Sequence, residues 1–319
     1  AATPWPCGTG VTRSSTRHAP TAAPVTPTTA APRAVLPPPS VRDQVVAAVA
    51  KSGEADPVPA NLTPALNAIG KPEVFVNGCV LSWRDVQQPE CVSGDLGAST
   101  TVALVGDSHA AMWQPALEPI ATERHWRLQT MSKALCPLMD LSINSPYLGR
   151  PFTECEQWRS GVLAQLEKER PQLIVVDMSR RYGADFGFTS YDQAWQDGLK
   201  RLVQRLRATG AKVLVLGPVA DPHSTVPTCV SAHMDDAVAC APSRAEGLND
   251  KGVATEAAAT AAGGGQYAAL SELFCTPERC PVIVGNTLVY RDDNHVTTEY
   301  AKVVAPVLTD MIEGSLARS

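Results

Sequence analysis

The sequence predicts a doubly wound α/β domain, in which a central parallel sheet carries helices on both faces. From Thr101 onward, short apolar runs alternate with helix-like segments, and strand–helix–strand alternation of this kind builds parallel sheets. The chain of 319 residues has room for one such domain of roughly 200–250 residues and for extensions. A flavodoxin-like strand order is consistent with this pattern.

The main domain is expected to span residues 99–319, and its elements follow one another in regular order. The strand candidates are apolar or β-branched and bounded by turn residues; they are residues 101–106, 126–131, 173–178 and 212–217. The helix candidates are residues 115–124, 156–170, 190–209 and 297–313. A long irregular region is expected over residues 220–252, followed by an Ala-rich helix.

Two segments precede this domain. Residues 1–40 are rich in Pro, Thr and Ala, with nine prolines, and such a composition cannot bury enough surface to fold, so we expect a disordered tether. Residues 41–98 begin with an amphipathic helix candidate, Val41 to Lys51, and are expected to form an N-terminal extension packed on the main domain. An independent module is the alternative, which the small amount of apolar material disfavours.

Composition and charge disfavour two classes of function, nucleic-acid binding and a membrane-spanning role. Formal net charge is −5 and only 18% of residues are charged, with the basic ones scattered, so we expect no nucleic-acid partner. No apolar run reaches the roughly 20 residues that span a bilayer, and we expect the chain itself to be soluble. It begins at Ala1 without a signal-peptide pattern, which suggests a processed protein or a fragment of a larger one.

Eight of the nine cysteines fall into close sequential couples. These are Cys79 with Cys91, Cys136 with Cys155, Cys229 with Cys240, and Cys275 with Cys280. Such spacings suggest local disulfides and an oxidising compartment. Metal binding is the rival interpretation, although there is no CxxC and no His/Cys cluster at zinc spacing, so we expect no metal and no cofactor. The sequence does not fix the pairing, and Cys7 is left over.

The first strand candidate of the main domain runs into Gly106, Asp107, Ser108 and His109 and then into helix-compatible sequence. Ligands bind at the carboxyl ends of parallel strands, so Ser108 is expected at the position of a site. At a helix start, free backbone N–H groups can stabilise the oxyanion that forms when a serine attacks a carbonyl. The alternative is an ordinary turn with a helix N-cap, where Asp and Ser are common.

A nucleophilic serine requires a general base and a group that orients it. Asp292 lies three residues before His295, just ahead of the last helix candidate. On one turn, this spacing lets the carboxylate reach the Nδ1–H while Nε2 faces Ser108. Alone, the pair could equally be a capped helix start with a surface histidine. Because it occurs together with the Ser108 turn, the sequence predicts Ser108, Asp292 and His295 as a catalytic triad.

These motifs resemble a known family. Gly106-Asp107-Ser108 and Asp292-x-x-His295 look like the first and last blocks of the SGNH hydrolase/acyltransferase superfamily. A closer resemblance, over about residues 75–315, is to the C-terminal SGNH (GDSL-like) domain of acyltransferase family 3 membrane O-acyltransferases. It is carried by Val105 to Trp113, Lys133-x-x-Cys136-Pro137, Cys155-x-x-Trp158-Arg159 and Tyr290 to His295.

The resemblance implies an SGNH-hydrolase-like three-layer sandwich and a division of labour. An integral-membrane acyltransferase domain, expected in the same polypeptide, would deliver an acyl donor across the membrane. An extracytoplasmic SGNH domain would then place an acetyl or other short acyl group on a carbohydrate or glycolipid of the cell envelope. In this arrangement residues 1–40 would be the tether that leaves the last membrane helix.

The chain also departs from the SGNH pattern, which has a Gly after the second strand and an Asn after the third. Here Ser132-Lys133-Ala134 and Asp177 to Arg181 stand at those places. We expect the oxyanion to be bound by the backbone N–H groups of Ser108 and Lys133, with a further donor from Ser179 or Arg180. For Arg180 and Arg181, solvated charges are the favoured alternative. Asp107 and His109 are candidate substrate-binding residues, a packed histidine being the alternative for His109.

Acyl transfer through a Ser-His-Asp triad and an acyl-enzyme is therefore the predicted function. A carbohydrate O-acetyl esterase is the alternative if water rather than a sugar accepts the acyl group. Two non-catalytic alternatives are a glycan-binding domain and a scaffold for the membrane partner.

Overall fold

The structure is a computed structural model that describes residues 10, 40–53 and 57–318. The described residues from Ser40 onward form one compact unit. The tether predicted over residues 1–40 falls, apart from Gly10 and Ser40, outside the described residues, as does Cys7. Within the described part of the chain, no helix combines the length and apolarity of a bilayer span.

A parallel sheet forms the centre of the unit, as the sequence predicts. Its strands are β1 (Val80–Leu81), β2 (Val92–Gly94), β3 (Thr100–Gly106), β4 (Trp126–Lys133), β7 (Leu173–Asp177), β8 (Lys212–Leu216) and β9 (Gln266–Ala268). The order is β1-β4-β3-β7-β8-β9, and only β2 pairs antiparallel, along β4. Strands β4-β3-β7-β8-β9 thus follow the flavodoxin-like order 2-1-3-4-5.

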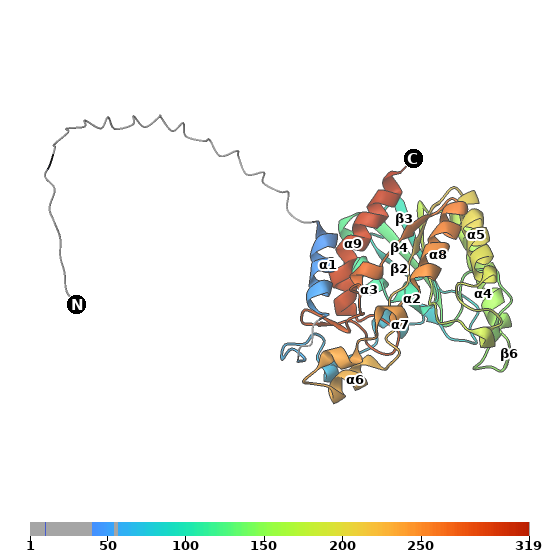
Figure 1. Cartoon of the computed structure of the whole chain (residues 1–319). Helices are drawn as coiled ribbons and strands as arrows, with labels where there is room; N and C mark the ends of the chain where they lie inside the picture. Colours follow the sequence, from blue (N-terminus) through green and yellow to red (C-terminus); the bar gives the residue numbers. More distant parts are fainter. Residues whose placement is uncertain (1–9, 11–39, 54–56, 319) are drawn as a thin grey trace. The chain divides into compact units, whose positions relative to one another are not determined.

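Helices cover both faces of the sheet (Figure 1). On one face lie α1 (Val41–Lys51), α3 (Gln114–Glu123) and α9 (Thr298–Ala317). On the other lie α4 (Thr153–Glu169), α5 (Gln193–Ala208) and α8 (Asp250–Ala262). The predicted three-layer α/β fold is confirmed.

Each strand contributes to two cores because successive side chains point to opposite faces. On β3, Val102 and Leu104 are buried on the α9 side, whereas Ala103 and Val105 are buried on the α4 and α5 side. The amphipathic helix α5 buries Leu199, Leu202, Val203 and Leu206, the i, i+3, i+4, i+7 spacing of one helix face. The sheet is therefore covered on both sides, and its strand ends are left to carry the site.

Residues 41–98 share this core and this sheet. Val45 and Val49 of α1 are buried against the α9 side, and β1 extends the sheet beside β4. A capping box between Ser40 and Asp43 begins α1. The segment is thus held to the sheet by strand pairing as well as by side-chain packing.

Some boundaries differ from the prediction. Strand β4 runs two residues past the predicted end, to Lys133, and α4 begins three residues early, at Thr153. The region expected to be irregular, residues 220–252, holds the short helices α6 (Val226–Ala232) and α7 (Arg244–Gly247). Helices of seven and four residues show little periodicity, so the pattern did not reveal them.

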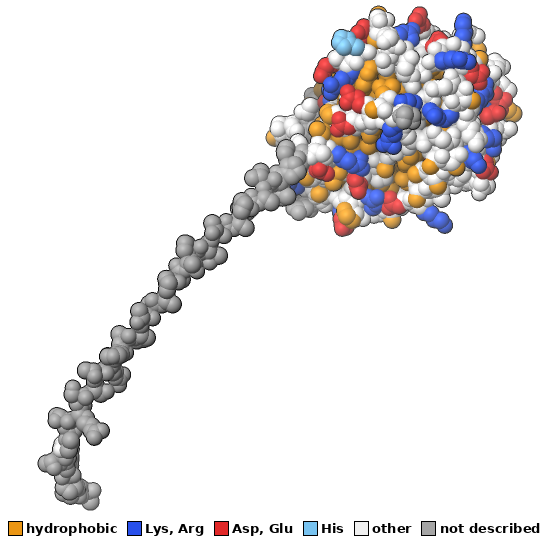
Figure 2. Space-filling view, turned by 90° about the horizontal axis from the view of Figure 1, so that it is seen from above, with side chains coloured by type: hydrophobic (Ala, Val, Ile, Leu, Met, Phe, Trp, Pro, Cys, Tyr) orange, Lys and Arg blue, Asp and Glu red, His pale blue; other side chains and the backbone are white. Residues whose placement is uncertain are grey.

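Four disulfides close short loops, and each joins the two members of a predicted couple. They are Cys79–Cys91, Cys136–Cys155, Cys229–Cys240 and Cys275–Cys280. On the face seen in Figure 2, Lys and Arg side chains are interspersed with Asp and Glu, so that basic groups do not gather into one field there.

Candidate active site

Ser108 stands at the carboxyl end of β3 because of the two residues before it. Gly106 ends the strand, and a Cβ at this position would lie 1.7 Å from the carbonyl oxygen of Asp177 on β7, so only glycine fits. Asp107 caps the short helix α2 (Ser108–Ala111) by accepting a hydrogen bond from the N–H of His109 at 2.9 Å. Ser108 therefore begins a helix beside β3 and β7, at the switch point of the sheet where ligands bind in this topology.

The structure brings Ser108, His295 and Asp292 together. The Nε2 atom of His295 lies 2.9 Å from the Oγ of Ser108, and its Nδ1 lies 2.8 Å from the Oδ2 of Asp292. The other carboxylate oxygen accepts hydrogen bonds from the N–H groups of His295 at 2.7 Å and Asn294 at 3.0 Å. The three side chains thus form a continuous hydrogen-bonded series across 187 residues of sequence.

The same contacts set the charge of Asp292. Burial alone would raise the pKa of this carboxyl, but the hydrogen bond and charge of His295 and the two backbone N–H groups hold the pKa well below its ordinary value. An ionised Asp292 favours the tautomer of His295 that carries its proton on Nδ1. Nε2 is then free to accept a proton from Ser108.

Phe75, a residue that sequence reasoning missed, supports His295 from the N-terminal extension. Its ring meets the imidazole edge-on, with ring centroids 5.4 Å apart. The guanidinium of Arg291 lies over the Phe75 ring, 4.3 Å from its centre. Only the phenylalanine's place in a segment with few large apolar residues could have drawn attention to it.

Asp107 faces the protein interior. One carboxylate oxygen accepts from the N–H of His109, and the other accepts from the N–H of Ser179 at 2.8 Å and from the hydroxyl of Tyr182 at 2.7 Å. The side chain is buried, and burial raises the pKa of Asp107 against these hydrogen bonds. Both oxygens are occupied by the protein, so the substrate contact expected for Asp107 finds no open oxygen. The N–H of Ser179 is occupied in the same way.

Arg180 is buried in an ion-pair network, so the favoured expectation of a solvated charge was wrong for this residue. Its guanidinium binds Asp177 at 2.9 Å and Glu256 at 3.0 Å, and its side chain is only 5% exposed. The network continues through Trp113, whose Nε1 donates to Asp177 at 2.7 Å. Glu256 also accepts from Trp195 and Tyr267. The partner Glu256 is 76 residues away, which explains why local sequence did not reveal the pairing.

Its neighbour Arg181 remains partly exposed, at 37%. It pairs with Asp221 at 3.2 Å and with Asp293 at 2.9 Å. Asp293 follows Asp292 directly, so Arg181 links the loop after β7 to the loop that carries His295.

Lys133 directs its side chain toward the loop of residues 82–85. The side chain is fully buried, and Nζ donates to the carbonyl oxygens of Ser82 and Asp85, both at 2.6 Å. Burial lowers the pKa of Lys133 to about 8. Lys133 therefore supports the loop of residues 82–85.

His109 is buried and packed beside His295, in agreement with the alternative weighed for it. The rings of His109 and His295 lie 5.5 Å apart, and burial, with the nearby positive charges, holds the pKa of His109 well below its ordinary value. It lines a small cavity of about 50 Å³ together with Arg181 and Asn294. Among the described residues, its buried Nε2 has no hydrogen-bond partner.

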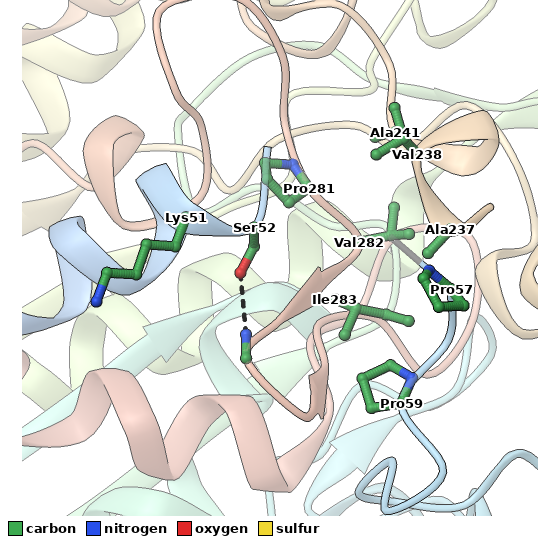
Figure 3. A pocket seen from close by; sticks show the side chains of 11 residues that line it. Lys51, Ser52, Pro57, Pro59, Ala237, Val238, Ala241, Pro281, Val282 and Ile283 are labelled. Atoms are coloured by element: carbon green, nitrogen blue, oxygen red, sulfur yellow. Dashed lines mark hydrogen bonds between the residues drawn. The ribbon is translucent and has the colours of Figure 1, made fainter. Parts of the chain in front are cut away.

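Within the described chain, the apolar pocket lacks the serine and histidine of this site, and a cysteine–histidine cluster lacks free thiolates for a metal. A pocket of about 370 Å³, lined by Pro57, Val238, Ile283 and other mainly apolar side chains, contains neither Ser108 nor His295 (Figure 3). Cys229, His233 and Cys240 lie within 4.8 Å of one another. Because both sulfurs are joined in a disulfide, they are not the free thiolates that bind zinc.

A solved periplasmic domain has a similar fold. A search of curated proteins finds no match. The periplasmic domain of the lipopolysaccharide acetyltransferase of Salmonella ser. Paratyphi A is similar in structure, with a TM-score of 0.53 at 15% identity, over 75% of this chain and 88% of that one. An acetyl xylan esterase, AlAXEase, matches with a TM-score of 0.43 at 12% identity, over 67% of this chain and 99% of that one.

A comparison with protein families gives the assignment. Residues 78–310 match the family described as the SGNH domain fused to AT3 domains. This match covers well over half of the chain, and it includes both the Ser108 turn and the loop that carries His295. The chain therefore belongs to the family of SGNH domains that are fused to AT3 acyltransferase domains.

Proposed function

We propose that this chain is the extracytoplasmic catalytic domain of a serine O-acyltransferase, with Ser108 as nucleophile, His295 as general base and Asp292 as the group that orients it. The observation that carries the proposal is the hydrogen-bonded series from Asp292 through His295 to the Oγ of Ser108. A serine, a histidine and a carboxylate in this order form the arrangement that activates a serine hydroxyl.

The reaction proceeds in two balanced steps. His295 accepts the proton of Ser108 as its Oγ attacks the carbonyl carbon of an ester or thioester donor, and the leaving group departs with that proton from Nε2. A sugar hydroxyl then attacks the acyl-enzyme while His295 accepts its proton and returns it to Ser108. Water in place of the sugar would give hydrolysis, the esterase outcome.

We assign oxyanion binding to the backbone N–H of Ser108, which lies at the start of α2. The other candidates make contacts that serve other groups. The N–H of Ser179 binds Asp107, the guanidinium of Arg180 binds Asp177 and Glu256, and the Lys133 side chain binds the loop of residues 82–85. We therefore treat Ser179 and Arg180 as positioning residues. The backbone N–H of Lys133, which the contacts of its side chain do not involve, stays in the proposal as a second oxyanion donor.

The family and the cysteines support the proposed setting. SGNH domains of this family are fused to AT3 domains, which we propose as the membrane partner that delivers the acyl donor, with residues 1–40 as tether. Four disulfides are typical of an oxidising, extracytoplasmic compartment. The similar Salmonella domain belongs to a lipopolysaccharide acetyltransferase, and we propose an acetyl or other short acyl group as cargo and a cell-envelope glycan or glycolipid as acceptor.

Turnover of 4-nitrophenyl acetate tests the proposal. We expect release of nitrophenol by the wild type and a loss of about 10⁴-fold or more in kcat for Ser108→Ala. Ser231→Ala is the matched control, because this serine lies on α6 and its hydroxyl bonds only the nearby carbonyl of Thr228. Equal rates for the wild type and Ser108→Ala would overturn the proposal, and mass analysis of products formed with added sugar separates transfer from hydrolysis.

A further inference from the structure

Two aromatic side chains stack on each other at the surface. The ring centroids of Trp83 and Tyr147 lie 4.7 Å apart and the rings are inclined by 23°. Trp83 remains 37% exposed and Tyr147 60% exposed. Among the described residues they are the only aromatic members of the set of exposed large apolar side chains. Exposed apolar surface of this kind marks an interaction site more often than an isolated aliphatic side chain does.

The loop that carries Trp83 is fixed from below by Lys133. The two hydrogen bonds from its Nζ, to Ser82 and Asp85, bracket Trp83. The hydroxyl of Ser82 also donates to the carboxylate of Asp85, at 2.5 Å. Burying a lysine is costly unless its charge is well satisfied. This cation also lies 5.3 Å from the ring centre of Phe152. The charged group of a buried lysine thus holds the loop that carries Trp83.

Tyr147 is fixed by a hairpin. Strands β5 (Asn144–Ser145) and β6 (Arg150–Pro151) pair on either side of it. Within the turn, the N–H of Leu148 donates to the Oγ of Ser145 and the N–H of Gly149 donates to the Ser145 carbonyl. Gly149 has a φ of +64°, which favours glycine. Both rings are therefore presented by ordered turns.

The segments that hold this pair are connected to the two strands that flank β3, the strand that leads to Ser108. Lys133, which holds the Trp83 loop, ends β4, and β4 pairs with β3, the strand that leads to Ser108. Tyr147 lies close enough to Arg181, just after β7, to influence its pKa, and β7 is the other neighbour of β3. The residues around the hairpin, such as Ile143 and Phe152, belong to the core on the α4 and α5 side. The segment around His295, with Tyr290 and Val296, belongs to the core on the α9 side.

We propose that Trp83 and Tyr147 form a platform that binds a pyranose ring of the acceptor while the acyl group is attached to Ser108. The inference rests on the proposed function and names its acceptor subsite. The C–H groups on one face of a pyranose carry partial positive charge and are apolar, which suits the electron-rich face of an aromatic ring. The Tyr147 hydroxyl at the rim can exchange hydrogen bonds with sugar hydroxyls. The residues around the hairpin pack on the α4 and α5 side of the sheet, and the His295 segment packs on the α9 side, so we place the acceptor between them.

A pair of esters tests this platform in the 319-residue chain. Glucose pentaacetate carries its acetyl groups on a pyranose, and 4-nitrophenyl acetate does not. For Trp83→Ala and Tyr147→Ala we expect the ratio of kcat/KM for the sugar ester to kcat/KM for the nitrophenyl ester to fall about fivefold to tenfold. The matched controls Trp83→Phe and Tyr147→Phe keep an aromatic face, and we expect the ratio to stay within about threefold of the wild type.

Binding without turnover gives a second measurement. In Ser108→Ala, titration with glucose pentaacetate should shift the indole N–H resonance of Trp83, identified by its loss in Trp83→Phe, and Tyr147→Ala should weaken that titration. An unchanged ester ratio in the alanine variants, with Ser108-dependent turnover of both esters, overturns the platform and leaves the proposed function standing. A saturable shift of the Trp83 resonance without any turnover supports the platform and overturns the proposed function. Absence of both the turnover and the shift overturns both.

Discussion

The loop that carries His295 and the buried polar layer formed by Asp107, Asp177, Arg180 and Glu256 both contain carboxylates, but the two regions expose them differently. Asp292 is 32% exposed, whereas Asp177 is 2% exposed and Glu256 is fully buried. The pKa of Asp292 is held low by His295 and backbone N–H groups despite partial burial. Burial raises the pKa of Asp177 to about 7 against the opposing influence of Arg180 and Trp113.

This difference separates two tasks. The His295 loop keeps an ionised carboxylate next to the imidazole that acts as general base in the proposed reaction. The buried polar layer holds the end of β7 and the turn after it in place. Asp107 accepts a hydrogen bond from the N–H of Ser179, and Arg180 forms an ion pair with Asp177, all among buried groups. Substitutions in the loop should therefore change activity, and substitutions in the layer should change stability.

The largest effect is expected in the loop. His295→Ala removes the base, and Asp292→Asn removes the charge that orients it, so we expect kcat/KM for 4-nitrophenyl acetate to fall about 10⁴-fold in each. Urea unfolding should show little change in stability. His223→Ala, at an exposed histidine, is the matched control. A loss of activity below about tenfold for both variants would remove the loop from the catalytic machinery.

A smaller effect, on stability rather than chemistry, is expected in the buried layer. Arg180→Met leaves Asp177 and Glu256 buried without their cation, and we expect urea unfolding to show a loss of about 3–5 kcal/mol. Arg181→Met is a control at the next residue, where partly exposed ion pairs should contribute no more than about 1 kcal/mol. Equal losses at both positions would contradict the contrast between buried and exposed pairs.

The pH dependence of stability sharpens the comparison further. Because the folded-state pKa of Asp177 is about 7 and the ordinary value is 3.8, the folded protein holds a proton between these pH values that the unfolded chain has released. Stability should therefore fall as pH rises from about 4 to about 7 and then level off. The change should be on the order of a few kcal/mol.

Asp177→Asn cannot titrate, so its stability should decline less over this range. A residual slope is expected from Asp107, whose pKa burial also raises. Urea unfolding at a series of pH values provides the measurement. Parallel stability curves for the wild type and Asp177→Asn would show that Arg180 keeps Asp177 ionised throughout.

Much of the fold was predictable because its signals are local. The four predicted strands occur within two residues of their expected ends, since apolar runs between turn residues mark buried strands. The short strands β1 and β9 are absent from the prediction because two or three residues carry no period. Their place is set by pairing with β4 and β8.

In the candidate site too, residues with a local sequence pattern were predicted and residues whose contacts are distant in the sequence were not. Ser108 and the Asp292–His295 pair could be found because each follows a strong local pattern, and the fold brings them to 2.9 Å. The contacts of Lys133 and Ser179 were not predicted, because their partners are distant in the sequence. Lys133 binds Ser82, 51 residues away, and Ser179 binds Asp107, 72 residues away. Phe75 contacts His295, and its only local signal is that it is a large apolar residue in a segment that has few of them.

Labelling with a fluorophosphonate tests the central claim most directly, because this reagent traps only a serine that a nearby base has activated. The account predicts one adduct per chain, located on Ser108 by peptide mass spectrometry, and at least about a hundredfold slower labelling in His295→Ala. Absence of an adduct on Ser108 in the folded wild type, or equal labelling rates with and without His295, would contradict it.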